Sequence, residues 1–358
     1  MNERDNGAEL ATSGDQPSQN EESLAARAKV LTIGRLRSRV NLPETTALLA
    51  VLLVEFVFFS IQSEYFFLYA NLVNVLQNVA VIGIIACPAT LLLVAGQVDL
   101  SVGSAAGFIG MSMAVAATAT DAITTPFGLG LSLMGAFLVA LLATFLIGGI
   151  NGSLVTVVGL NSIITTLGTL AILRGLTKVI GDGQTIRING FNKLGVVRPL
   201  FDIPLSVYLF ALVVILFYII MRFTVYGRSM YAIGASPEAA RLAGIRVRLL
   251  IFIGFMLSAL AVALAGLIRL SQIGGASTQA GVGFELAVLT AVILGGASLS
   301  GGRGTIVGTV LAVFVVGVLQ NGLIQLNVDS FWIEVAQGVL LVGAVTFDQI
   351  RLRMAGLD

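Results

Sequence analysis

Histidine is absent from the 358-residue chain, and cysteine occurs once, at Cys87. Without histidine the chain cannot build Ser-His or Cys-His catalysis, a histidine-ligated metal site or a histidine proton relay. The single cysteine lies in an apolar run beside Pro88, so an internal disulfide and a thiolate metal cluster are excluded. We therefore expect no catalytic residues, no metal and no cofactor.

Charged residues are also scarce. Asp, Glu, Lys and Arg make up 11% of the chain, whereas an ordinary globular domain has about 25%. Hydrophobic residues reach 57%, and the mean hydropathy is +0.98. This composition is typical of a polytopic membrane protein. The net charge of +1 argues against a nucleic-acid partner, which would need a basic face.

Ten apolar stretches approach the roughly 20 residues that a helix needs to cross a bilayer. They lie near 45–62, 79–97, 101–119, 129–149, 161–180, 204–222, 249–268, 285–298, 304–325 and 332–347. The region 79–119 is nearly continuous and fits either two full helices or one broken helix followed by another. We predict an all-α, polytopic transmembrane helical bundle of about ten spans.

The distribution of basic residues predicts the orientation. Residues 1–28 are polar and should be disordered, and they lack the layout of a cleavable signal sequence. With both termini and the central segment placed inside, fourteen Lys and Arg lie inside and five outside. We expect a disordered cytoplasmic tail with a basic collar (1–44), a transmembrane domain (45–350) and a cytoplasmic tail (351–358). The location predicted is the plasma membrane, crossed several times.

The central segment 222–248 contains the signals of a short helix. Ser236 can cap its start, Pro237 suits its first position, and Glu238 faces the positive end of its dipole. Gly244 can close it in a left-handed turn. A capped polar helix between spans indicates a docking site for a partner outside the bilayer. A plain connecting loop, whose arginines fix the topology, is the alternative.

Polar groups inside the apolar stretches suggest where a solute could pass. Uncharged hydrogen-bonding groups suit a neutral, polyhydroxylated solute better than an ion. The candidates for the translocation path are Gln97, Asp99, Ser101, Asn151, Asn161, Thr165 and Asn321. Transmembrane Asn and Thr also bond neighbouring helices, and Asp99 could simply cap a helix, so a structural role is the alternative for each. We expect Arg174 and Glu285, near span ends, to reach the membrane interface.

Four ordered motifs resemble one family. They are Gly96-Gln97-Val98-Asp99-Leu100-Ser101-Val102-Gly103, the block 159–169 with Arg174-Gly175-Leu176, the glycine-rich turn 295–305, and Gln320-Asn321-Gly322-Leu323. The first is similar to the Gly-x-(Ile/Val)-Asp-Leu-Ser-x-Gly signature of ribose-, xylose- and galactoside-type permeases of binding-protein-dependent ABC importers. Glu238-Ala239-Ala240 followed by Gly244 looks like the EAA loop of such permeases, where the partner ATPase docks.

The resemblance implies a type II importer fold and a monosaccharide, ribose-like or related, as the solute. The coupling residues it implies are Gly234, Ser236, Pro237, Glu238, Ala239, Ala240 and Gly244. The implied partners are a cytoplasmic ABC ATPase, an extracytoplasmic sugar-binding protein, a second permease copy and membrane lipid. The turn 295–304 lacks a nucleotide-binding Gly-Lys pair, so we expect ATP hydrolysis on a separate chain.

Two alternatives stay open. An ion-coupled secondary carrier of a small polar solute would need a titratable centre at mid-membrane, for which Asp99 is the candidate. The segment 181–203, placed outside, is either a solvated connector or a landing surface for the binding protein.

Overall fold

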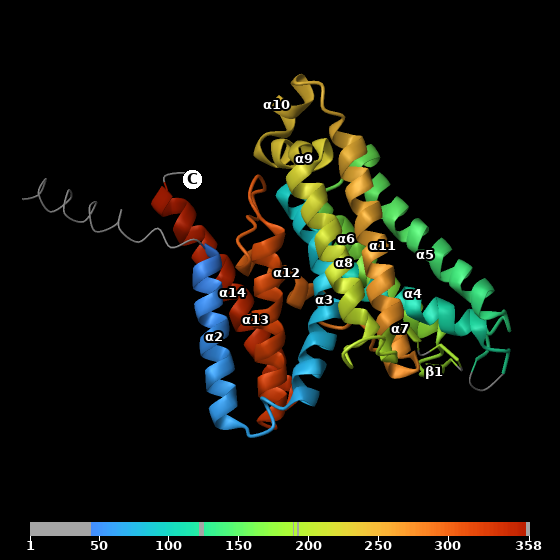
Figure 1. Cartoon of the computed structure of the whole chain (residues 1–358). Coiled ribbons are helices and arrows are strands. Elements are labelled where there is room, and N and C mark those ends of the chain that lie inside the picture. Colours follow the sequence, from blue (N-terminus) through green and yellow to red (C-terminus); the bar gives the residue numbers. More distant parts are fainter. Residues whose placement is uncertain (1–43, 122–124, 189, 192, 356–358) are drawn as a thin grey trace, which may run out of the picture. The chain divides into compact units, whose positions relative to one another are not determined.

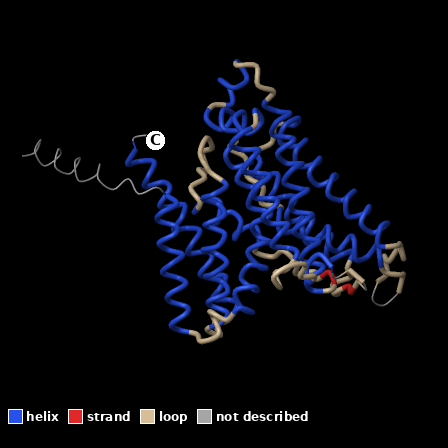
Figure 2. The backbone as a smooth tube through the Cα atoms, viewed as in Figure 1, coloured by secondary structure: helices blue, strands red, loops and turns tan. Residues whose placement is uncertain are grey.

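The computed structural model describes residues 44–121, 125–188, 190–191 and 193–355, which form a bundle of helices (Figures 1 and 2). The predictions for residues 1–43 lie outside the described residues. The long helices are α2 (Glu44–Gln62), α3 (Tyr69–Val94), α5 (Leu133–Ser153) with the π-helical turn η1 (Leu154–Val158), α6 (Ser162–Ile180), α8 (Leu205–Phe223), α11 (Val247–Ile273), α13 (Ile306–Gln325) and α14 (Ser330–Ala355). The shorter ones are α4 (Val102–Ala117), α7 (Lys193–Val196), α9 (Val225–Ala235), α10 (Pro237–Leu242) and α12 (Phe284–Leu294).

The apolar helices match the predicted spans. Seven of the described helices are long and apolar enough to cross a membrane, and three shorter apolar helices cover Val102–Ala117, Phe284–Leu294 and Ser330–Thr346. Each predicted stretch corresponds to one of them, which confirms the helical bundle. Two-residue strands β1 (Ile186–Arg187) and β2 (Gly275–Ala276) add a small antiparallel pair that the sequence did not predict.

Helix α3 begins ten residues before the predicted start at 79, in a polar stretch that holds four amide side chains. The side-chain amides of Asn71 and Asn321 each donate to the other, at 2.9 and 3.0 Å. Gln325 also donates to Asn71, at 2.6 Å, and Gln77 donates to the carbonyl of Gly195 at 2.7 Å. These bonds satisfy amides that would be costly in a membrane, so the helix extends through them.

The centre of the bundle is formed by α3 and α11. In α3, 78% of the apolar stretch that could cross a membrane is buried inside the bundle. The corresponding share is 67% in α11 and 11% in α2. Helix α11 packs against α3, α4 and α5, and α3 also packs against α8, α12 and α13. Helices α2, α6 and α8 expose many large apolar side chains. These peripheral surfaces therefore suit lipid or another membrane protein.

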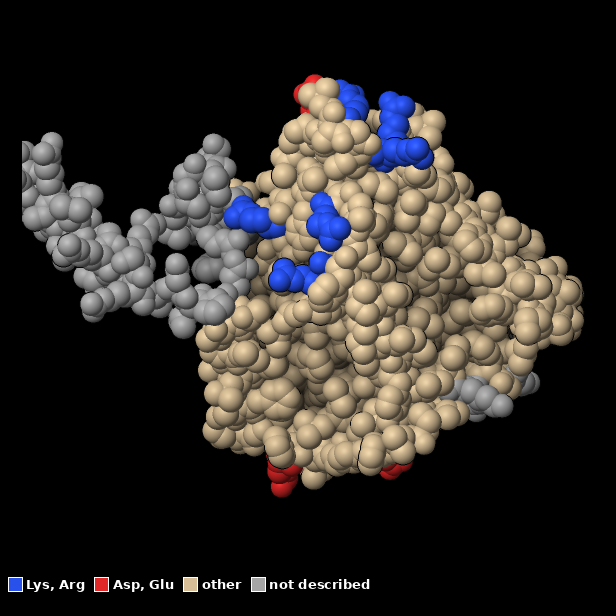
Figure 3. Space-filling model, turned by 45° about the horizontal axis from the view of Figure 1, so that its top comes forward, with Lys and Arg blue, Asp and Glu red and all other residues tan. Residues whose placement is uncertain are grey.

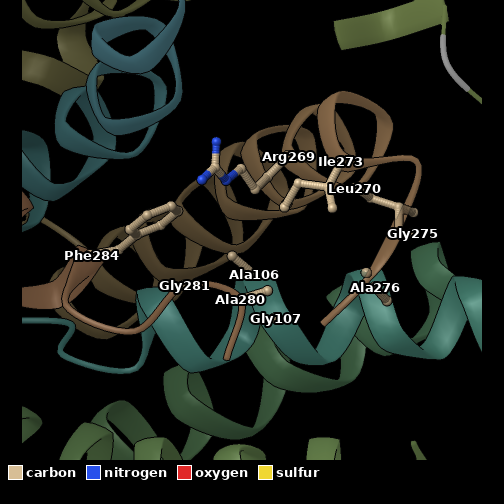
Figure 4. Close-up of a pocket in the computed structure, with 12 residues that line it drawn as sticks. Ala106, Gly107, Arg269, Leu270, Ile273, Gly275, Ala276, Ala280, Gly281 and Phe284 are labelled. Atoms are coloured by element: carbon tan, nitrogen blue, oxygen red, sulfur yellow. The ribbon is translucent and has the colours of Figure 1, made fainter. Parts of the chain in front are cut away.

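Small residues allow the close contacts around α4 and α11. Methyl groups added to Gly148 or Gly152 of α5 would collide with side chains of α11. On α4, the glycines at 103 and 107 lie against the carbonyls of Gly281 and Ala280. Figure 4 shows this contact between α4, α11 and the 275–281 segment, with Arg269 extending toward Phe284. Glycines four residues apart on α4 and on α5 thus allow close packing.

Candidate functional site

The predicted short helix exists as α10, just beyond the ends of α8 and α11 (Figure 1). The Ser236 hydroxyl accepts a hydrogen bond from the Ala239 amide at 3.2 Å, and Pro237 is the first helical residue. Gly244 has a φ of +83°, and the Ile245 amide donates to the Ala240 carbonyl at 3.0 Å. Both ends of the helix are therefore fixed locally, as the sequence predicts.

One face of α10 is held and the other is presented outward. Ala240 is 4% exposed, whereas Leu242 is 83% exposed. Glu238 and Arg241 lie 3.7 Å apart on the exposed face, where such a pair contributes little to stability. An outward leucine flanked by charges, on a helix fixed at both ends, is suited to binding a protein partner.

The preceding helix, α9, was not predicted, and it carries Gly234 into a backbone junction. A methyl group on Gly234 would collide with the carbonyl oxygen of Val94, the last residue of α3, and with the amide of Gly302. The Gly302 amide donates to that same Val94 oxygen at 2.8 Å. Tyr231 of α9 adds a bond from its hydroxyl to the Gly304 carbonyl, at 2.7 Å. Helix α9 therefore rests directly on α3 and on the 295–305 turn.

The break between α3 and α4, residues 95–101, is tied to the start of α6. The Val98 amide donates to the Ser162 hydroxyl at 3.2 Å, and the Leu100 amide donates to the Thr166 hydroxyl at 3.1 Å. These hydroxyls satisfy backbone groups that the break removes from helical hydrogen bonding. The region 79–119 is therefore one long helix, a polar break and a shorter helix.

Asp99 is the centre of a polar network inside this break. One carboxylate oxygen accepts from the Ser101 amide at 3.0 Å and from the Ser101 hydroxyl at 2.6 Å. The other accepts from the Ser258 hydroxyl of α11 at 3.1 Å. Ser101 also accepts from the Asn151 amide at 3.0 Å, and Asn151 accepts from the Thr169 hydroxyl at 2.7 Å. The network joins α4, α5, α6 and α11.

The remaining candidates lie in three different settings. Asn161 is exposed and caps α6, accepting from the amides of Ile163 and Ile164 at 2.9 and 3.3 Å. Thr165 is buried and donates to the Asn161 carbonyl at 2.9 Å. Asn321 lies away from this group, in the amide cluster with Asn71. The structure thus gathers Asp99, Ser101 and Asn151 but places Asn321 elsewhere.

Gln97 is half-buried and borders two recesses. The larger, of about 910 Å³ and open to the surface, lies between α5, α6 and α11 and is lined by polar groups that include Thr156, Asn161 and Arg248. The smaller, of about 260 Å³, lies between α3 and α12 and is lined by Gln97, Asp99 and Glu285 together with apolar side chains. A solute in either recess would meet the same amide side chain.

Arg174 and Glu285, which the sequence predicts near the membrane interface, pair with each other. Their side chains are 23% and 15% exposed, and the guanidinium and carboxylate lie 3.6 Å apart, between α6 and α12. Sequence reasoning missed this pair because α6 and α12 are far apart in the chain. The usable signal was that each apolar segment held a charge of opposite sign.

Basic side chains gather at the α9–α10 end of the bundle (Figure 3). Arg222, Arg228, Arg241, Arg246 and Arg248 are all exposed there. Acidic groups appear at the tip and at the opposite edge of the face shown in Figure 3. The central segment is therefore basic in the folded protein as well as in the sequence.

Comparisons with known proteins extend over most of the chain. The sequence profile described as "Branched-chain amino acid transport system / permease component" matches residues 71–345. The ribose import permease protein RbsC of Escherichia coli K12 is 35% identical over 321 residues, covering 88% of this chain and 96% of that protein.

Two further relatives carry a different name. The autoinducer 2 import system permease protein LsrC of Photorhabdus luminescens is 33% identical over 317 residues, covering 88% of this chain and 92% of the relative. LsrC of Yersinia enterocolitica is 33% identical over 316 residues, covering 88% and 84%. No solved structure matches the chain.

Proposed function

The chain belongs to the family of permease components of branched-chain amino acid and ribose-type ABC importers, and on this premise we propose that it imports a ribose-type sugar. Its membrane domain is an all-α type II permease, and ATP hydrolysis takes place on a separate chain. Relatives named for ribose and for autoinducer 2 match almost equally well. Autoinducer 2 is therefore the second candidate solute.

Helix α10 is the proposed docking element for the ATPase. Support comes from its two fixed ends and from the 83% exposed Leu242. The coupling residues proposed are Gly234, Ser236, Pro237, Glu238, Ala239, Ala240 and Gly244. We propose that the α9–α10 end, with its arginines, lies in the cytoplasm, and that both termini are cytoplasmic as the distribution of basic residues predicts.

The observation that carries the coupling proposal is the backbone junction of Val94, Gly234 and Gly302. A displacement of α10 by the ATPase moves α9, and α9 touches the last residue of α3 without an intervening side chain. The break 95–101 begins one residue further along the chain. Coupling to the solute path then requires that the break can take two positions. The permease must bind the solute with a different affinity in each of them.

The proposed path passes Gln97, which borders both recesses. Amide, hydroxyl and carboxylate groups there can exchange hydrogen bonds with sugar hydroxyls. Asp99, Ser101 and Asn151 bond mainly with one another, and we propose that they hold the break in shape beside the path. Asn161 and Thr165 would line its entrance at the start of α6, whereas Asn321 serves helix packing.

The complete importer needs partners beyond the ATPase. We propose an extracytoplasmic sugar-binding protein and a second permease copy, identical or related, in the bacterial inner membrane. The exposed apolar faces of α2, α6 and α8 are surfaces available to that copy and to lipid.

Reconstitution with the ATPase and a binding protein tests the coupling. Glu238→Arg places a cation in the first turn of α10 and on the surface offered to the ATPase. We expect ribose uptake to fall about tenfold or more, with the variant folded and the ATPase still active. Gly244→Trp should have the same effect, because tryptophan is strained at a positive φ.

The matched control exchanges the charges of the exposed pair, as Glu238→Arg with Arg241→Glu. This double variant restores the ion pair within α10, but the charges that face the ATPase remain exchanged. Uptake should therefore stay low. Normal uptake by the Glu238→Arg variant would contradict the proposal. Uptake in ATP-depleted vesicles driven by an imposed ion gradient would instead indicate a secondary carrier.

A further inference from the structure

A recess that the transport proposal does not use opens at the α9–α10 end, between the first turns of α2 and α13 and the junction of α8 with α9. It holds about 1210 Å³ of non-protein space and is open to the surface. Its polar lining consists of Thr45, Tyr218, Arg222, Arg228, Tyr231 and Thr305. These two arginines, two tyrosines and two threonines can all donate hydrogen bonds, and none of the six carries a carboxylate.

Neither arginine forms an ion pair with an acidic residue whose side chain the structure describes. The ion pairs of that part of the chain involve Arg174, Arg198 and Arg241. Arg228 makes one long bond, 3.4 Å, to the carbonyl of Phe223. Two arginines that line one recess give it a positive charge, which a bound anion would neutralise.

Tyr231 and Arg222 line the same recess. Burial raises the pKa of Tyr231, and the charge of Arg222 acts in the opposite direction. The Tyr231 hydroxyl donates to the Gly304 carbonyl at 2.7 Å, so its position is fixed at the wall of the recess. Arg222 is exposed and lines the same recess as this fixed tyrosine.

The start of α13 adds a second source of positive potential. Thr305 caps this 20-residue helix by accepting from the Gly308 amide at 3.1 Å. Ile306 and Val307 also line the recess, and the amides at the first positions of a helix have no partner within it. An anion in the recess would face both the helix dipole and the two arginines.

The surroundings are apolar, which decides the kind of anion. Helix α13 packs against both α2 and α8, and in Figure 1 it lies between them. Val307, which lines the recess, is 48% exposed, and α8 carries further exposed apolar side chains such as Phe223 and Ile219. A ligand with a phosphate and acyl chains fits this combination, whereas a soluble anion would use only the arginines.

We propose that this recess binds the headgroup phosphate of an anionic phospholipid, between Arg222 and Arg228, with its acyl chains against α8 and α13. Basic pockets between transmembrane helices at the membrane surface recognise such headgroups. The site is separate from the docking face of α10 and from the recesses around Gln97. Because Tyr231 belongs to α9, a bound lipid would contact the helix that leads to α10.

Lipid retention by the purified full-length chain tests this site. The protein is exchanged into nanodiscs of equal parts phosphatidylglycerol and phosphatidylcholine, and the lipids that stay bound after transfer to detergent are counted by native mass spectrometry. We expect phosphatidylglycerol to be retained selectively. Arg222→Gln with Arg228→Gln should lower that retention about 5- to 30-fold, from the loss of two charges at a membrane surface.

Two control variants separate the recess from general surface charge. Arg246→Gln with Arg248→Gln removes the same charge from the same end, and neither residue lines the recess, so retention should stay within about twofold. Arg222→Lys with Arg228→Lys keeps the charge and should retain most of the lipid. If the Gln pair does not fold, the single variants should each lose about fivefold.

Three results would overturn the proposal. One is equal loss of phosphatidylglycerol from both Gln pairs, which would indicate general surface charge. Another is displacement of the lipid by millimolar inorganic phosphate, which would indicate a site for a soluble anion. The third is unchanged lipid retention with weakened ATPase binding in the Arg222 and Arg228 variant, which would place these arginines in a protein interface.

Discussion

The two breaks between consecutive helices, 95–101 and 295–305, begin in the same way and are then held by different groups. At each, a glycine follows the helix end with a positive φ, +72° at Gly96 and +91° at Gly296. The next amides, of Gln97 and Ala297, fold back to carbonyls of the last helical turn at 2.9 and 3.1 Å. This geometry is a standard helix end.

Beyond that shared start the breaks differ. The first is partly buried and is held by side chains of α6 and α11, which bond to its backbone and to Asp99. The second lies against α3 and α9 and is held mainly by backbone contacts at glycines. The shape of the break 95–101 depends on polar side chains that bond to it. The shape of the break 295–305 depends on glycines, whose lack of a side chain lets the backbones touch. Removing atoms should therefore damage the first break, and adding atoms the second.

The largest effect is expected from Asp99→Leu. It removes the acceptor for the Ser101 amide and hydroxyl and for the Ser258 hydroxyl, all within the bundle. We expect a loss of about 3–5 kcal/mol, measured as thermal or denaturant unfolding in detergent. Asp99→Asn keeps one oxygen acceptor and should lie in between. Asp329→Leu, at an exposed position, is the control, and equal stability of both leucine variants would contradict the role of Asp99.

Gly234→Ala should have the next largest effect. It adds a methyl group, whereas Asp99→Leu removes hydrogen-bond acceptors. The added methyl group meets the Val94 carbonyl and the Gly302 amide, so α9 must move away from α3. We expect a loss of about 1–3 kcal/mol and lower coupling of ATP hydrolysis to uptake. Gly175→Ala of α6 adds the same methyl where nothing lies within 4 Å and should be neutral or stabilising by up to about 1 kcal/mol. The same sign at both positions would disprove the close contact.

The smallest effects sharpen the contrast between the two breaks. Thr166→Val removes the acceptor of the Leu100 amide in the first break and should cost about 1–2 kcal/mol. Ser298→Ala removes the acceptor of the Ser300 amide in the second break, where Ser300 is exposed and water can replace it. We expect a change below about 0.5 kcal/mol. Equal unfolding midpoints for the two variants would mean that side chains hold both breaks alike.

Local signals were enough to predict α10. Ser236, Pro237, Glu238 and Gly244 act within their own helix turns, so their pattern is readable without the rest of the chain. The apolar stretches were predicted for the same reason, since length and hydropathy are properties of one segment.

Long-range partners could not be predicted. The start of α3 was missed because the partner of Asn71 is 250 residues away, at Asn321. Arg174 and Glu285 were assigned to the interface because the sequence around each residue carries no signal that identifies the other as its partner. Helix α9 was missed although Thr224 caps its start locally, accepting from the Gly227 amide at 3.1 Å, and its contacts with α3 and the 295–305 turn are long-range. Asp99, by contrast, is a candidate from the sequence alone, but its bond to Ser258 depends on how α11 packs.

The junction of Val94, Gly234 and Gly302 also sets how stiff the contact between the two helices is. A contact made through long side chains can yield, because the side chains rotate to new rotamers when the helices shift. Here the atoms in contact belong to the main chain, and no torsion between them is free to absorb a displacement. We therefore expect a movement of α9 toward α3 to displace the end of α3 as well.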